Sequence, residues 1–135
     1  MPSRPGRPTA DELPLSRNYR LHVMNADGTD VHPISDGLGG ESGARWSPDG
    51  TRILYVGNRL TGLEVYVIQD DGTGRRNVTS NQILNDSDAA WSPTGDRIIY
   101  TSSEYPSPVL YEVPADGSRP AVPILTGAAR FSAWR

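Results

Sequence analysis

Short runs of alternating apolar and polar residues, separated by turn-forming residues, extend along most of the chain, and this pattern is typical of β-strands. One unit predicts four strands, with tight turns where Ser-Pro-Asp-Gly and Asp-Asp-Gly sequences interrupt the alternation. These strands are expected at residues 42–46, 52–56, 63–68 and 75–79. A second unit repeats the order, with strands at 97–100, 109–113 and 121–125. Because no segment carries a sustained apolar stripe of helical period, essentially no helix is expected.

Two sequence markers recur in fixed phase along the chain. The first is a tryptophan at spacings of 45 and 43 residues, followed in two copies by Ser-Pro-Asp-Gly or Ser-Pro-Thr-Gly. The second is an Asp-Gly turn that recurs after 44 and 45 residues. The residues that mark this repeated structural core are Trp46, Trp91, Trp134, Gly50, Gly95, Gly28, Gly72 and Gly117. A period of about 40–50 residues, rich in strand signals, predicts propeller blades of four strands each.

The 135 residues therefore predict an all-β fold, a partial β-propeller of about three four-stranded blades. The blades are expected at residues 11–135, with the first and the last interrupted, and the Pro- and Arg-rich residues 1–10 are expected to be a disordered tail. The three tryptophans are interpreted as blade-core residues because a buried indole contributes a large apolar area.

Composition narrows the function classes. The net charge of −3 gives no electrostatic footprint for nucleic acid or an anionic membrane. With no cysteine, disulfides, thiol chemistry and Cys-ligated metals are excluded. The N-terminus has no apolar region typical of a signal peptide, and no segment is apolar enough to span a bilayer, so membrane insertion is not expected. The chain as written is expected to be cytoplasmic, and periplasmic if it is a fragment or a mature form.

Residues 41–55 followed by 63–68, and again residues 86–113, resemble the TolB-type β-propeller repeat, although Thr94 stands where that repeat usually has Asp. The resemblance covers residues 19–135 and implies a propeller. In that family the repeats form the six-bladed propeller of periplasmic TolB, a partner of cell-envelope lipoproteins. They also form the propellers that gate S9-family serine peptidases. The resemblance does not choose between these roles.

The two ends of the chain suggest a way for three blades to close. Residues 13–16, 19–24 and 31–35 resemble strands two to four of a blade that lacks its first strand, and residues 131–135 resemble a first strand. Exchange of these terminal strands between two chains would give a homodimer with a closed six-bladed ring. The alternative is that the chain is a fragment of a longer propeller, because a part of a repeat array still shows the same repeat pattern. Both interpretations stay open.

The candidate metal ligands are Glu41, Asp86 and Asp88, which precede the first strand of a blade beside the expected channel. Oxygen ligands suit calcium, but the third copy of the repeat has Ala129 at the matching place, so solvated loop acids are the favoured interpretation. Residues 25–30 echo a calcium loop but lack its closing Glu, and an Asp-Gly hairpin is favoured. No metal or cofactor is therefore expected, and the two histidines, His22 and His32, are interpreted as surface positions.

The sequence contains no recognisable catalytic motif. There is no Gly-x-Ser-x-Gly turn and no phosphate-binding loop that opens a helix, so an enzyme is not expected. The predicted function is a non-catalytic TolB-like scaffold for protein–protein interaction, with an unidentified protein partner and no nucleic acid. The alternative is a gating or ligand-binding module split from an S9-type peptidase or a carbohydrate-active enzyme.

Overall fold

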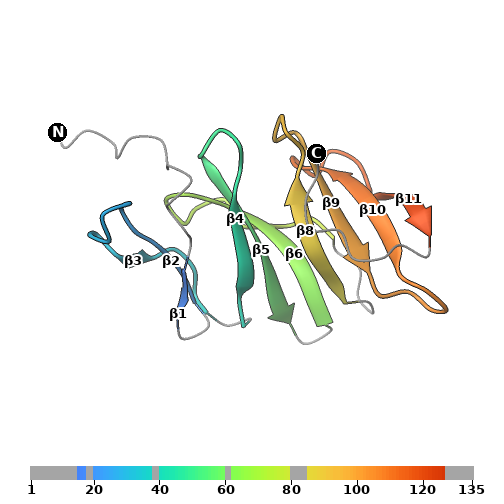
Figure 1. Cartoon of the computed structure of the whole chain (residues 1–135), viewed down its shortest axis with the longest axis horizontal. Coiled ribbons are helices and arrows are strands. Elements are labelled where there is room, and N and C mark those ends of the chain that lie inside the picture. Colours follow the sequence, from blue (N-terminus) through green and yellow to red (C-terminus); the bar gives the residue numbers. More distant parts are fainter. Residues whose placement is uncertain (1–14, 18–19, 38–39, 60–61, 80–84, 127–135) are drawn as a thin grey trace.

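A computed structural model describes residues 15–17, 20–37, 40–59, 62–79 and 85–126 of the chain. Within these residues, eleven strands form three antiparallel sheets and there is no helix (Figure 1). The all-β fold predicted from the alternation is confirmed. Among the described residues there is also no helix long and apolar enough to cross a membrane.

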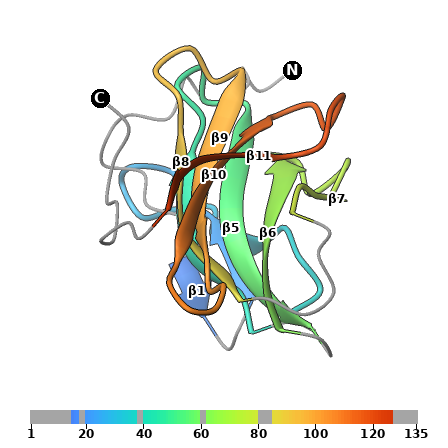
Figure 2. The ribbon, with the colours of Figure 1, turned by 90° about the vertical axis from the view of Figure 1, so that its right-hand side faces the viewer.

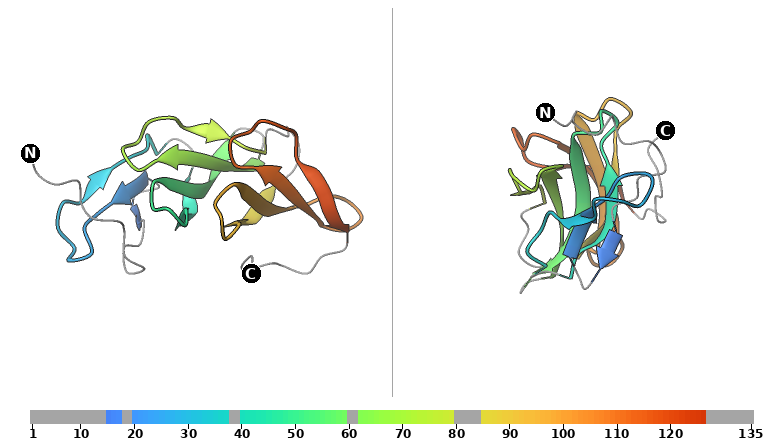
Figure 3. Two further views of the ribbon diagram at one scale, coloured as in Figure 1. Left: turned by 90° about the horizontal axis from the view of Figure 1, so that it is seen from above. Right: turned by 90° about the vertical axis from the view of Figure 1, so that its left-hand side faces the viewer.

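The three sheets follow one another in chain order, and each is built from sequence neighbours. The first contains β1 (Leu15–Arg17), β2 (Arg20–Val23) and β3 (His32–Pro33). The second contains β4 (Ser42–Trp46), β5 (Arg52–Arg59), β6 (Gly62–Gln69) and β7 (Arg76–Asn77). The third contains β8 (Asp86–Trp91), β9 (Arg97–Ser102), β10 (Val109–Pro114) and β11 (Val122–Thr126). The view from above in Figure 3 shows the sheets arranged in a row, and in the end-on view of Figure 2 they overlap one behind another.

Several strands differ in extent from the sequence expectation, and β5 and β7 are two clear cases. The second strand of the middle sheet, β5, continues to Arg59, because its register with β6 holds through the pair Arg59 and Gly62. The outer strand β7 is only two residues long, whereas five were expected. A short outer strand offers few unpaired backbone groups at the sheet edge, which limits unwanted pairing with other molecules.

The hydrophobic core lies between the sheets. Along β5, Ile53 and Tyr55 belong to the cluster shared with the first sheet, whereas Leu54 belongs to the cluster shared with the third. Successive side chains of a strand point to opposite faces, so a strand that is apolar at every position needs a partner on both faces. The middle sheet is packed in this way, and its neighbours on the two sides complete its core.

Trp91 joins the middle and third sheets. Its side chain belongs to the core between them, and its indole Nε1–H donates to the Arg45 carbonyl oxygen over 3.2 Å. The Arg52 guanidinium lies 4.9 Å from the centre of the indole ring and also donates to the Gly95 carbonyl oxygen over 2.8 Å. Trp46 occupies the equivalent position one sheet earlier, where it is partly buried against the core. Trp134 lies outside the described residues.

The Thr94 departure from the repeat is compensated two residues later. In the middle sheet the carboxylate of Asp49 accepts hydrogen bonds from the hydroxyls of Ser47 and Thr51, over 2.6 and 2.8 Å. In the third sheet the sequence reads Ser-Pro-Thr-Gly-Asp, and the carboxylate of Asp96 accepts from Ser92 over 2.9 Å and from Thr94. The Asp and the Thr have exchanged places, and the same carboxylate–hydroxyl network closes both turns.

Candidate functional site

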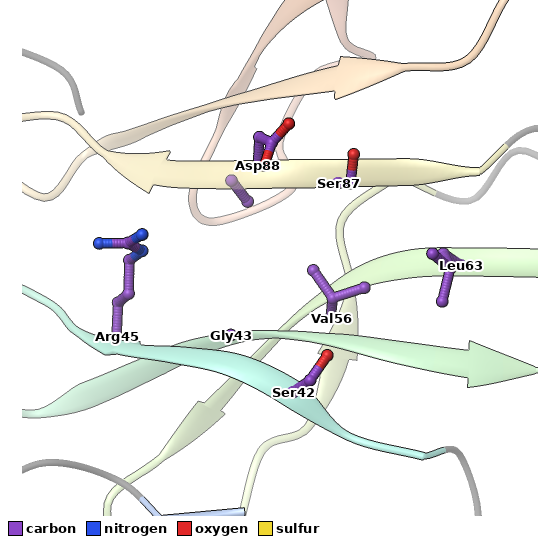
Figure 4. A pocket seen from close by; sticks show the side chains of 8 residues that line it. Ser42, Gly43, Arg45, Val56, Leu63, Ser87 and Asp88 are labelled. Carbon is purple, nitrogen blue, oxygen red and sulfur yellow. The ribbon is translucent and has the colours of Figure 1, made fainter. Parts of the chain in front are cut away.

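The first strands of two neighbouring sheets, β4 and β8, form the walls of a pocket. Each is the end strand of its sheet, so one of its edges carries no neighbouring strand of that sheet within the described part of the chain. The pocket between them has a volume of about 240 Å³ and reaches down to the second and third strands of the middle sheet (Figure 4). It is lined by Ser42, Gly43, Arg45, Val56, Leu63, Ser87, Asp88 and Ala89.

A β-bulge shapes each wall of the pocket. The pairing register shifts between Ser42 and Arg45 in β4, and between Ser87 and Ala90 in β8. The bulged residue of β4 is Gly43, whose φ of 65° is a conformation that glycine adopts freely. Its counterpart in β8 is Asp88, whose φ of 51° places a side chain in the left-handed region. Such a conformation costs on the order of 1 kcal/mol in a residue other than glycine.

The pocket combines opposite charges with an apolar floor. Arg45 and Asp88 are exposed and stand on opposite walls, with the Arg45 side chain extending from β4 into the space between the strands (Figure 4). Within the described residues neither side chain forms an ion pair. Val56 and Leu63 lie below them and are partly buried. The pocket can therefore offer a cation and an anion to a ligand, together with an apolar surface between them.

Glu41 and Asp86 are buried, which corrects the interpretation of them as solvated loop acids. Glu41 is 3% exposed, and its carboxylate accepts hydrogen bonds from the Leu21 backbone N–H over 3.1 Å and from the Ser35 hydroxyl. Leu21 lies in β2 and Ser35 lies just after β3, so Glu41 joins two blades. Asp86, its counterpart, is fully buried and is the first residue of β8 rather than part of a loop before it. A buried carboxylate needs such hydrogen bonds to offset its desolvation.

A tyrosine lies close to each of these carboxylates. Burial, and then the negative charge of Glu41, raise the pKa of Tyr55 well above its usual value of 10.0. Burial and the charge of Asp86 raise the pKa of Tyr100 in the same way. Each tyrosine also stacks on a second tyrosine of the next strand, with ring centres 5.4 Å apart for Tyr55–Tyr66 and 5.6 Å apart for Tyr100–Tyr111. The repeated carboxylate–tyrosine arrangement is part of the blade core.

The three candidate metal ligands do not form a common site. Within the described ranges no group of three or more His, Cys, Asp or Glu side chains is arranged to hold a metal ion. Glu41 is hydrogen-bonded toward the first sheet, whereas Asp88 lines the pocket between the second and third sheets.

The loop at residues 25–30 is an Asp-Gly hairpin. Its Asp27 carboxylate accepts hydrogen bonds from the backbone N–H and the hydroxyl of Thr29, over 2.9 and 2.5 Å. The same arrangement joins Asp71 to Thr73 in the next hairpin. Of the two histidines, His22 is partly buried and His32 is exposed.

Sequence reasoning named Asp88 but missed the rest of the pocket. Arg45, Val56 and Leu63 were read only as parts of strands, and the contact between β4 and β8 brings them to one place. One signal was present in the sequence. When the two repeats are aligned, Asp88 falls opposite Gly43, so one copy carries a carboxylate where the other has no side chain.

The stacked four-stranded sheets, their order and the contacts between them define blades of a β-propeller, and comparison with solved structures bears this out. TolB from Acinetobacter baumannii matches over 83% of this chain with a TM-score of 0.67 and 22% sequence identity. An oligogalacturonate lyase in complex with manganese matches over 82% with a TM-score of 0.66 and 16% identity. A puromycin hydrolase matches over 82% with a TM-score of 0.58 and 19% identity.

These similarities establish the fold, a partial β-propeller related in structure to the blades of TolB. The chain spans 27% of the length of that TolB, 31% of the lyase and 22% of the hydrolase. No protein-family model matches the sequence. The same blades therefore occur both in TolB and in enzymes, and function has to be argued from the site itself.

Proposed function

We propose that the chain is a non-catalytic propeller scaffold that binds a protein partner through the face formed by β4 and β8. The observation that carries this proposal is the pocket between these strands, where Arg45 and Asp88 stand on opposite walls over an apolar floor. A surface that offers both charges and an apolar contact is suited to recognition. The described pocket residues include serine hydroxyls but no histidine beside them that would act as a base.

The rigidity of the surrounding sheets supports this proposal. Leu54 and Val65, beneath one wall of the pocket, are fully buried in the core that also contains Trp91. The carbonyl of Arg45 is held by the Trp91 indole. Binding residues positioned by a rigid scaffold lose little conformational entropy when a partner binds, which favours affinity.

The first test is recovery of a partner. The purified full chain is used to capture proteins from its source cells, and binding is then measured with the purified partner at low and high salt. A photo-reactive residue at Ser87, in the pocket, should cross-link to that partner, whereas one at the exposed Ser118 should not. The proposal fails if no reproducible partner is recovered at either salt concentration, or if only the Ser118 position cross-links.

A second candidate function is a gating or ligand-binding module that works beside an enzyme domain. The structural matches to an oligogalacturonate lyase and a puromycin hydrolase favour it, because propeller blades stand within both of those chains. An open reading frame that adjoins this one in the genome and carries a hydrolase or lyase motif would support the second candidate. Binding of a purified protein partner with no such neighbour would support the scaffold.

We further propose that two chains associate into a six-bladed ring. Among the described residues, the first sheet has three strands where the other two have four. Val122, Ile124 and Leu125 of β11 are each about half exposed, and propeller repeats need neighbouring blades to cover their apolar faces. The strand predicted to be exchanged, at residues 131–135, lies outside the described residues.

A further inference from the structure

We infer that the pocket between β4 and β8 binds an extended peptide segment of the partner, in which an aliphatic side chain lies between an acidic and a basic residue. This inference rests on the proposed protein-binding function and adds the chemistry of the bound segment. The aliphatic side chain would contact Val56 and Leu63, the acidic residue would face Arg45, and the basic residue would face Asp88.

The first observation that supports this inference is the opposite charge of Arg45 and Asp88. Two other arginines of the middle sheet region are engaged within the protein, Arg52 with the Gly95 carbonyl and Arg75 with Asp36. Arg45 and Asp88 are exposed on opposite walls of one pocket, and within the described residues neither has an ion-pair partner. A segment with one charge of each sign, correctly spaced, satisfies both groups, whereas a ligand of a single charge would be repelled by one wall.

The second observation that supports this inference is the backbone conformation of Asp88. The equivalent position in β4 is Gly43, which adopts a similar positive φ without a side chain. The chain therefore keeps a carboxylate at a position where glycine would be the more stable choice. Strained residues of this kind cluster at binding and catalytic sites, where the strain positions a group for its task.

The form of the pocket indicates an extended peptide. Both walls are end strands of their sheets, and a peptide can lie along such an edge with alternate side chains pointing into the pocket. The partly buried floor of Val56 and Leu63 is apolar and accommodates an aliphatic group between the two charged ones. The three contacts thus fall on alternate residues, i, i+2 and i+4, of one short segment.

Trp91 provides a reporter within the protein. Its indole N–H donates to the carbonyl of Arg45, so a ligand that moves Arg45 should shift the indole resonance in a ¹H–¹⁵N spectrum. The probes are acetylated and amidated heptapeptides of sequence Ser-Glu-Ser-Leu-Ser-Lys-Ser, the reversed Ser-Lys-Ser-Leu-Ser-Glu-Ser and the neutral Ser-Gln-Ser-Leu-Ser-Gln-Ser. At least one charged probe should give a saturable shift, and the neutral probe should bind more weakly by about tenfold.

Variants separate a binding role of Asp88 from a structural one. Asp88→Asn and Arg45→Gln should each lower the affinity for the charged probe by roughly five- to tenfold. The matched controls are Asp30→Asn, at another exposed aspartate of positive φ, and Arg119→Gln on an exposed turn, and both should leave the affinity unchanged. Asp88→Gly should raise the melting temperature while it weakens binding, because it removes the strain together with the carboxylate.

The inference is overturned if no charged probe shifts Trp91, if the neutral probe binds equally well, or if Asp88→Gly retains full affinity. These outcomes are distinct from failure of the proposed function. If a purified partner binds equally well to wild type, Asp88→Asn and Arg45→Gln, the proposed scaffold function holds. The partner then binds at a surface other than this pocket.

Discussion

Trp91 illustrates how single residues join the blades. Its ring packs between the middle and third sheets, its N–H is bound by Arg45, and the Arg52 guanidinium lies over its face. Replacement by alanine removes all three interactions and leaves a cavity in the core. We expect Trp91→Ala to lower the free energy of unfolding by about 3–5 kcal/mol, measured by urea denaturation.

Trp46 supplies the comparison for this prediction. It holds the equivalent place one sheet earlier, but its side chain is only partly buried. Trp46→Ala should therefore cost clearly less than Trp91→Ala, because the loss scales with the apolar area that is removed from the core. Equal and small losses for the two variants would contradict the placement of Trp91 at the central interface.

The buried tyrosines predict a loss of stability at alkaline pH. In the folded chain the pKa of Tyr100 lies well above the ordinary 10.0, because burial and Asp86 disfavour the phenolate. As pH rises past about 10, tyrosine ionises in the unfolded chain while Tyr100 stays protonated in the folded one, so the free energy of unfolding falls with increasing pH.

This pH dependence is checked by urea denaturation of wild type and Tyr100→Phe between neutral pH and pH about 11. Phenylalanine cannot ionise, so the variant should lose less stability than wild type over the alkaline part of the range. The same slope in both proteins would contradict the assignment of a raised pKa to Tyr100.

At the scale of the element, two hairpin glycines offer a matched pair. Gly28 and Gly72 occupy equivalent Asp-Gly turns with φ of 83° and 85°. A Cβ on Gly28 would meet nothing within 4 Å, whereas a Cβ on Gly72 would lie 2.8 Å from the Ile34 carbonyl oxygen of the preceding blade. Gly28→Ala should cost on the order of 1 kcal/mol for the backbone conformation alone.

Gly72→Ala should cost clearly more than Gly28→Ala, because it adds a clash with the Ile34 backbone, just after β3, to the same conformational cost. Thermal unfolding of the two variants measures the difference. Equal shifts in melting temperature would show that the β6–β7 hairpin does not contact the first sheet as closely as described.

The turn after the tryptophan gives a further prediction at this scale. Ser92 is 1% exposed, accepts from the Arg97 N–H over 3.1 Å and donates to Asp96. Ser92→Ala removes the hydroxyl that accepts from the Arg97 N–H and donates to the Asp96 carboxylate, and it should cost about 1–3 kcal/mol. The double variant Thr94→Asp/Asp96→Thr, which restores the order seen at Asp49 and Thr51, should keep the wild-type melting temperature. A large loss in the double variant would refute the compensation.

Many of the strands and hairpins could be predicted from the sequence, because they depend on local signals. The alternation in residues 52–56 and 63–68 and the Asp-Gly turns fix strands and hairpins through neighbouring residues alone. The pocket depends instead on how two blades meet, which no local pattern encodes. Glu41 and Asp86 were misread for the same reason: an acid before a strand looks solvated until a neighbouring blade is seen to cover it.

At the scale of the whole molecule, each sheet depends on its neighbours. The middle sheet is apolar on both faces, and each face is covered by an adjacent sheet. Proteins built this way gain stability from every interface, so a missing neighbour leaves apolar surface exposed. The half-exposed Val122, Ile124 and Leu125 of β11 form such a surface within the described residues.

The claim that these blades work as an assembled scaffold is tested most directly by the solution mass of the full chain. Light scattering after size-exclusion chromatography should give about twice the chain mass of 14.7 kDa. Deletion of residues 131–135 should yield aggregate or an unfolded monomer, because the proposed ring needs these residues as its closing strand. A compact, well-folded monomer that is unaffected by the deletion would contradict the six-bladed assembly.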